Sequence, residues 1–226
     1  MSRYGSGLRV VAIGGSLREH SCSYHALEHV TALLHDLDCQ VQTLDLRELQ
    51  LPFCNGDNRD SRPGYPGVAK LRRSVSEAQA VVLATPEYHG GVSGVLKNAL
   101  DLLSIEHLEG KIAGVIAVLG GTTSSNALNE LARILRCCHA WVLPEYIAIA
   151  RADAVFRGGA IHDGDLLKRF DRFAQSLVWS ATRMSGSRTP AAFENKQTGV
   201  IHETYSSSLS LPRSGGDPIG DARSIG

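Results

Sequence analysis

The chain has 226 residues, 23 basic against 23 acidic side chains and 43% hydrophobic residues, which is the balance of an ordinary globular protein. A chain of this length buries roughly 70% of its unfolded surface, so one domain is expected without disulfides or a structural metal. The formal net charge of zero provides no global field for attracting nucleic acid or an anionic membrane. Proteins that bind nucleic acid or an anionic membrane through their overall charge are therefore disfavoured.

The cysteines are odd in number and contain no C-x-x-C pair, which predicts neither a disulfide framework nor a zinc site; they are Cys22, Cys39, Cys54, Cys137 and Cys138. No apolar run approaches the roughly 18 residues of a membrane span, and the first seven residues lack the apolar region of a signal peptide. We therefore expect a protein of the reducing cytoplasm.

Short apolar runs alternate along the chain with segments of helical periodicity, which predicts right-handed βαβ crossovers and a doubly wound α/β sandwich. The expected strands are 8–13, 39–44, 80–85, 112–119 and 140–149, the last interrupted by Pro144. The expected helices are 23–34, 68–77, 94–103, 124–138 and 163–184. Strand 112–119 is the most apolar and is expected to be central.

Two stretches fall outside this rhythm. Residues 55–66 form a long polar loop rich in Gly and Pro, which is expected at the ligand edge of the sheet. Residues 186–226 are rich in Gly, Ser and Pro and are expected to be a disordered tail, with a short pairing segment at 199–205 as the alternative. The predicted folded domain is therefore 1–185.

The loop 14–23 joins the first strand to the first helix, where unpaired amides and the helix dipole favour an anion. The hydroxyls of Ser16, Ser21 and Ser23 add donors, and Arg18 offers a forked contact to phosphate. The loop contains neither G-x-G-x-x-G nor the P-loop motif, so a monophosphate is the expected occupant. The alternative is a Gly/Ser-rich turn that binds no ligand.

A second motif follows the third expected strand. Residues 85–101 read TPEYHGGVSGVLKNALD and resemble the T-P-E-Y-N-x-x-x-P-G-x-L-K-N-A-[IL]-D signature of the NADPH-dependent FMN reductase family. Residues 15–23 resemble that family's G-S-L-R-x-x-S-x-N loop, and 51–57 resemble its L-P-x-[YF]-N-x-D segment. The resemblance implies a flavodoxin-like three-layer sandwich whose five-stranded parallel sheet has the order 2-1-3-4-5.

The resemblance also implies an FMN cofactor, NADPH (or NADH) as electron donor and a homodimer or homotetramer. The residues that it assigns to FMN binding are Ser16, Arg18, Ser21, Cys22 and Ser23 at the phosphate, Pro86, Glu87, Tyr88, His89 and Gly90 beside the ring, and Gly120, Gly121 and Thr122 in a third loop. No catalytic side chain is expected, because the flavin performs the hydride chemistry itself.

Three positions depart from the family pattern. Ser23 and His89 stand where asparagine is usual, and Ser93 stands where proline is frequent. The change to His89 places an imidazole beside the flavin ring, where we expect it to alter the reduction potential or the choice of acceptor. Ser93 is expected merely to loosen the start of the helix.

The expected activity is transfer of hydride from NADPH to flavin and of electrons onward to free FMN, a quinone, an azo compound or chromate. Two alternatives belong to other classes: a non-catalytic FMN-binding electron carrier, and a flavin-free phosphate-binding module. His25 and His29 lie four residues apart on the first helix, but no third ligand is placed, so no metal is expected.

Overall fold

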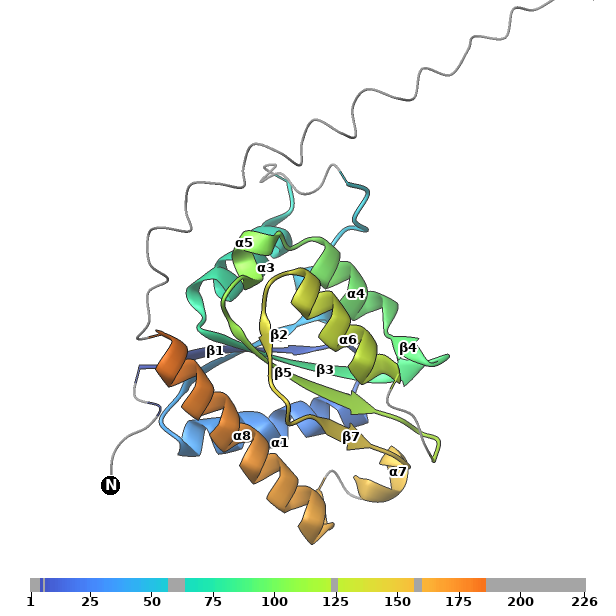
Figure 1. The fold of residues 1–226 in the computed structure, drawn as a ribbon. Coiled ribbons are helices and arrows are strands. Elements are labelled where there is room, and N and C mark those ends of the chain that lie inside the picture. The colour runs from blue at the N-terminus through green and yellow to red at the C-terminus, as the bar shows by residue number, and fades with distance from the viewer. Residues whose placement is uncertain (1–4, 6, 57–63, 123–125, 157–159, 186–226) are drawn as a thin grey trace, which may run out of the picture. The chain divides into compact units, whose positions relative to one another are not determined.

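The computed structural model describes residues 5, 7–56, 64–122, 126–156 and 160–185 (Figure 1). In this part of the chain a single mixed sheet is built from β1 (Arg9–Gly14), β2 (Gln40–Asp45), β3 (Ala80–Tyr88), β4 (Gly91–Val92), β5 (Ile112–Val118), β6 (Trp141–Val142) and β7 (Ile147–Ile149). The order is β2-β1-β3-β5-β6, with β7 also on β5 and β4 on β3. All pairings are parallel except the β3–β4 hairpin.

The predicted five-strand order is confirmed when β6 and β7 are counted together as the fifth strand. They are two short pieces separated by a segment that contains Pro144, because proline cannot donate to a sheet ladder. Strand β5, which we expected to be central, is an internal strand with β3 on one side and β6 and β7 on the other, and β3 takes the middle position. All seven residues of β5 are nevertheless buried, as its apolar sequence requires.

The helices in this part of the chain are α1 (Cys22–Asp36), α2 (Leu46–Leu49), α3 (Pro66–Glu77), α4 (Gly94–Asp101), α5 (Ile105–Leu108), α6 (Asn126–Cys137), α7 (Ala152–Val155) and α8 (Gly164–Ser185). The five long helices are those expected, with ends shifted by up to two residues. The residues just before α6 lie outside the described part. The helices α2, α5 and α7 were not predicted, because one turn is too short to show helical periodicity.

The helices cover the sheet on both faces. In Figure 1, α1 and α8 lie below the sheet, and α3, α4, α5 and α6 lie above it. Alternate residues of each strand enter one core or the other: Val10 and Ala12 of β1 pack toward α1 and α8, whereas Val11 and Ile13 pack toward the opposite layer. This is the predicted three-layer α/β architecture.

Gly114 lets α8 approach the sheet closely. A Cβ atom added at Gly114 of β5 would lie 2.4 Å from Cζ of Phe173, whose ring is fully buried. The neighbouring Phe170 is also fully buried and meets the His29 ring of α1 edge-on at 4.9 Å. Burial lowers the pKa of His29. This histidine therefore serves the packing of α1 on α8.

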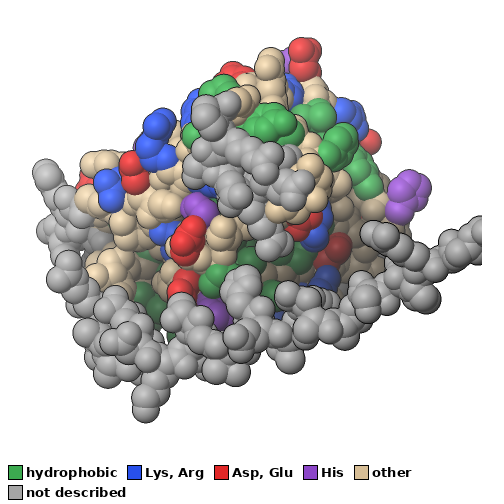
Figure 2. Space-filling model, turned by 90° about the horizontal axis from the view of Figure 1, so that it is seen from above, with side chains coloured by type: hydrophobic (Ala, Val, Ile, Leu, Met, Phe, Trp, Pro, Cys, Tyr) green, Lys and Arg blue, Asp and Glu red, His purple; other side chains and the backbone are tan. Residues whose placement is uncertain are grey.

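The face of the molecule that carries α3 to α6 shows side chains of mixed type (Figure 2). Figure 2 looks onto the α3–α6 side, and side chains of both charge signs are scattered over the part not covered by grey atoms. None of the described helices combines the length and the hydropathy that crossing a membrane requires. The predicted tail 186–226 and most of the expected polar loop, residues 57–63, lie outside the described residues.

Candidate functional site

Three loops meet at the carboxyl edge of the sheet, where a ligand is expected in this architecture. They follow β1, β3 and β5, which are neighbours in the sheet. The strand registers pair Gly14 with Ala84 and Pro86 with Val118, so the three strands end at nearly the same level. The structure thus brings the three predicted groups of site residues to one edge.

The loop after β1 is organised by its buried serines. Ser21 is the N-cap of α1, and its Oγ accepts a hydrogen bond from the Tyr24 amide at 3.3 Å. Ser23 is 1% exposed, and its hydroxyl lies 3.2 Å from that of Ser21. Ser16 Oγ accepts from the Arg18 amide at 3.2 Å. These bonds set the curvature of the loop.

The backbone of this loop retains donor capacity. Among the described residues, no acceptor pairs with the amides of Leu17, Glu19 and His20. The first amides of α1 also point out of the helix, as they do at every helix N-terminus. Together with the Ser16 hydroxyl, this donor set suits an anion with several acceptor oxygens, such as a phosphate group.

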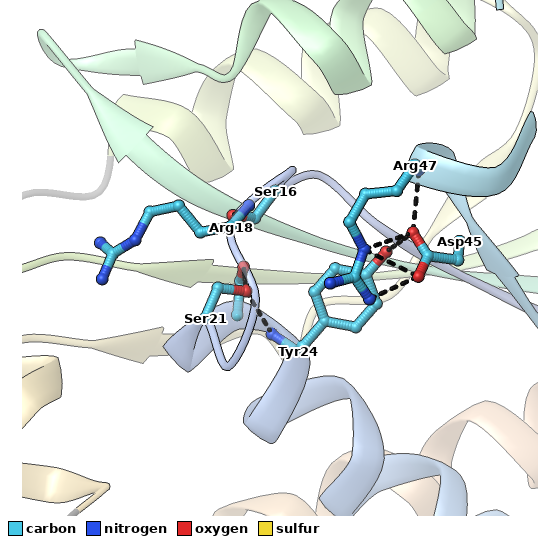
Figure 3. Close-up of polar contacts among 7 residues, drawn as sticks. Ser16, Arg18, Ser21, Tyr24, Asp45 and Arg47 are labelled. Atoms are coloured by element: carbon cyan, nitrogen blue, oxygen red, sulfur yellow. Dashed lines mark hydrogen bonds and ion pairs between the residues drawn. The ribbon is translucent and has the colours of Figure 1, made fainter. Parts of the chain in front are cut away.

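Arg18 and Cys22 differ in exposure. The Arg18 side chain is exposed and extends away from Tyr24 and Arg47 (Figure 3). Cys22 is half-buried, and its thiol donates toward Asp153 at 3.8 Å. Burial, and then the Asp153 carboxylate, raise the pKa of the Cys22 thiol. The thiol is therefore held protonated and is a poor nucleophile.

The predicted ring-side residues lie on a β-hairpin and not, as expected, on a loop. Strand β3 continues through Pro86 to Tyr88 and turns back at His89 and Gly90, whose φ angles are +51° and +76°. Histidine and asparagine tolerate this left-handed conformation better than most residues. The turn thus accepts His89 in place of the family's asparagine. Tyr88, His89 and Gly90 are exposed.

The hairpin is fastened to α6 by two carboxylates. Glu87 is 8% exposed, and its Oε2 accepts from the Ala127 amide in the first turn of α6 at 3.2 Å. Glu130, one turn further along, accepts from the Val92 amide of β4 at 2.7 Å. Glu87 therefore faces the helix, and the exposed hairpin residues are left to contact a ligand.

The third loop follows β5. Gly120, Gly121 and Thr122 are exposed, and the Gly121 carbonyl accepts from the Arg151 amide at 2.9 Å. A Cβ atom at Gly120 would meet nothing within 4 Å. This segment presents open backbone at the same edge as the other two loops.

A cluster that the sequence analysis missed lies beside the first loop. The Tyr24 hydroxyl donates to Asp45 at 2.9 Å, and Arg47 binds both Asp45 oxygens and stacks 5.0 Å from the centre of the Tyr24 ring (Figure 3). The Arg47 guanidinium lowers the pKa of Asp45 to about 2. A polar residue directly after an expected strand is the signal that identifies Asp45.

This cluster predicts a stability change in acid. An unfolded aspartate titrates near about pH 3.9, above the folded value, so the stabilisation by Asp45 is complete above that pH. It is lost as the pH falls from about 4 toward about 2. We expect the wild type to lose more stability than Asp45→Asn between pH 5 and 3 in urea unfolding. Asp165→Asn, at the exposed Lys168 pair, is the matched control; equal losses in wild type and Asp45→Asn would contradict the prediction.

Comparison with known proteins decides the family. The model of the family described as NADPH-dependent FMN reductase matches residues 8–154. The chain belongs to the NADPH-dependent FMN reductase family. Members of this family are oxidoreductases that use FMN as cofactor and NADPH as electron donor. The cofactor and the electron donor that the sequence motifs indicated are therefore confirmed.

Two curated relatives of this chain are named as azoreductases. The chain is 37% identical over 123 residues to a NADPH azoreductase of Bacillus sp. (strain OY1-2), covering 54% of this chain and 64% of that protein. It is 34% identical over 140 residues to an FMN-dependent NADPH-azoreductase of Staphylococcus haemolyticus, covering 62% of this chain and 72% of that protein. The chain therefore spans about two thirds of the length of these relatives.

Solved structures support the fold of the chain. The flavoenzyme FerB, an NAD(P)H:(acceptor) oxidoreductase from Paracoccus denitrificans, aligns with a TM-score of 0.66 at 24% identity, over 78% of this chain and 98% of that one. A flavodoxin from the domain Archaea aligns with a TM-score of 0.55 at 12% identity, over 77% of this chain and 99% of that one. The predicted flavodoxin-like fold is confirmed.

The hydrogen-bond donors at the carboxyl edge of the sheet fit FMN. The first loop offers unpaired amides and a buried serine hydroxyl to a phosphate, and the other two loops offer exposed backbone at the same edge. The roles of the individual site residues remain predictions. No cluster of three or more metal-ligating side chains occurs in the described part of the chain. His25 instead pairs with Glu28 at 3.2 Å.

Proposed function

We propose that this chain is an FMN-dependent reductase that oxidises NADPH and delivers the electrons to a small, diffusible acceptor. The convergence of the three loops at one sheet edge carries the proposal, in a chain whose family uses both molecules. When bound, FMN supplies the hydride chemistry. The protein's part is to hold the phosphate, align the ring and offer backbone donors where negative charge develops.

The candidate acceptors are an azo compound, a quinone, free FMN and chromate. The names of the curated relatives favour the azo compound. A cavity of about 410 Å³ beside the first loop supports a planar apolar acceptor, because Leu17, Leu46, Leu51 and Val95 line much of it.

The proposal extends to assembly and location. Trp141 and Trp179 are 62% and 53% exposed, and tryptophan is enriched in protein interfaces, which supports a homodimer or homotetramer. Light scattering after size exclusion measures that state. All five cysteines are free thiols, which fits the reducing cytoplasm.

The test is anaerobic reduction of the FMN-loaded protein. We expect NADPH to bleach the flavin absorbance near about 450 nm, and admission of an azo dye or a quinone to restore it. A band that persists with NADPH and with NADH would identify the non-catalytic carrier. Failure to bind or turn over FMN even in excess would identify the flavin-free phosphate-binding module.

A further inference from the structure

Ser93 lies where two of the three site loops meet. It follows β4, caps α4 and is 1% exposed. Its Oγ accepts from the Leu96 amide at 3.3 Å, as an N-cap does. The sequence led us to expect that serine merely loosens the start of this helix. The structure overturns that expectation, because the same side chain and its amide make two further hydrogen bonds.

The first of these bonds reaches the loop after β1. Ser93 Oγ donates to the Gly15 carbonyl at 2.5 Å, across 78 residues of sequence. The Gly15 amide in turn donates to the Ala84 carbonyl of β3 at 2.7 Å. The first residue after β1 is thus fixed at both its amide and its carbonyl. A Cβ atom at Gly15 would lie 3.0 Å from Ser93 Oγ, so the fit is close.

The second bond reaches the strand that carries the hairpin. The Ser93 amide donates to Thr85 Oγ1 at 3.1 Å, and the Thr85 hydroxyl donates to the Pro86 carbonyl at 2.8 Å. Thr85 is fully buried. One residue therefore links the end of β1 to the segment where β3 becomes the hairpin.

Proline, the residue frequent at this position in the family signature, offers neither of these bonds, since it lacks both a hydroxyl and a backbone N–H. The link is a property of the serine. Buried bonds of this kind fix a single arrangement, because breaking one leaves a polar group unpaired.

We propose that Ser93 is a positioning residue that holds the phosphate loop (residues 15–23) at a fixed separation from the ring-side hairpin (residues 86–91). The inference rests on the proposed function, since it concerns the binding of FMN. The hairpin has its own attachment to α6 through Glu87 and Glu130. Loss of the Ser93 hydroxyl therefore releases the phosphate loop more than the hairpin.

Because the phosphate loop is released more than the hairpin, the change can be measured as a loss of preference for FMN over riboflavin. In the proposed complex FMN contacts both segments, whereas riboflavin has no phosphate for the first of them. Ser93→Gly removes the hydroxyl but largely preserves the helix cap, because glycine is well tolerated at that position. We expect Ser93→Gly and Ser93→Ala to weaken FMN by about tenfold and riboflavin by less than about twofold in calorimetric titration. The preference for FMN over riboflavin then falls by nearly the same factor.

Asp163→Ala is the matched control. Asp163 caps α8 by accepting from the amides of Asp165 and Leu166, on an element that carries no predicted site residue. This variant should lose similar stability and keep its preference for FMN. If both Ser93 variants keep the wild-type preference for FMN over riboflavin, whatever their stability, the inference is overturned. The proposed function still stands in that case, provided that the wild-type protein binds FMN. Wild-type protein that binds neither flavin would overturn both.

Discussion

Replacing Gly14 by alanine is expected to destabilise the protein by about 1–3 kcal/mol and to weaken FMN binding, because the new methyl group has no space. Gly14 ends β1 directly before the phosphate loop. A Cβ atom there would lie 2.7 Å from Cζ of Tyr24 and 3.0 Å from both Cε atoms. The ring is 9% exposed, and both Asp45 and Arg47 hold it in place. The clash therefore cannot be relieved by a simple side-chain rotation.

Urea unfolding of the apo protein measures the loss, with two comparisons that isolate its cause. Gly164→Ala, at the first residue of α8, adds the same methyl group where nothing lies within 4 Å and should be neutral or slightly stabilising. In a Tyr24→Ala background, Gly14→Ala should cost much less, since neighbouring sites that clash are not additive. The same penalty in both backgrounds would show that the ring is not the obstacle.

Much of the fold could be predicted because it depends on patterns local to each segment. The apolar run of β5 and the helical periodicity of α1 are visible in any short window of sequence. Pro144 likewise marked the break between β6 and β7. The hairpin was missed because the apolar run of β3 ends before Pro86 and Glu87, which led us to end the strand at Thr85, whereas β3 continues to Tyr88 and pairs with β4. Its turn depends on left-handed angles at His89 and Gly90, which a loop prediction does not specify.

In the candidate site, too, the features that depend on local sequence could be predicted and those that depend on distant contacts could not. Its three loops were predictable, since residues after neighbouring parallel strands must meet at one edge. The contacts that hold those loops were not. Ser93 meets Gly15 across 78 positions, and Glu130 meets Val92 across 38. A single sequence contains no signal for such a pair, because neither partner's own neighbourhood is unusual.

The structure distinguishes two arginines near the phosphate loop. The charge of Arg47 is neutralised by Asp45. The Nε of Arg47 donates to Oδ1 of Asp45 at 3.0 Å and to Oδ2 at 2.9 Å. Among the described residues none pairs with the guanidinium of Arg18, whose backbone amide is fixed to Ser16. Arg18 therefore has charge available for a phosphate, and its backbone is held while its side chain reaches outward.

Arg18→Ala is accordingly expected to weaken FMN by about 10- to 100-fold, the range of a hydrogen bond to a charged group, and to change riboflavin by less than about twofold. Arg18→Lys should fall between, because lysine keeps the charge but loses the forked geometry. Arg73→Ala removes an equal charge from the exposed face of α3 and should leave both affinities unchanged. If Arg18→Ala loses equal affinity for FMN and for riboflavin, Arg18 does not contact the phosphate. If only Arg47→Ala loses affinity selectively for FMN, that contact belongs to Arg47.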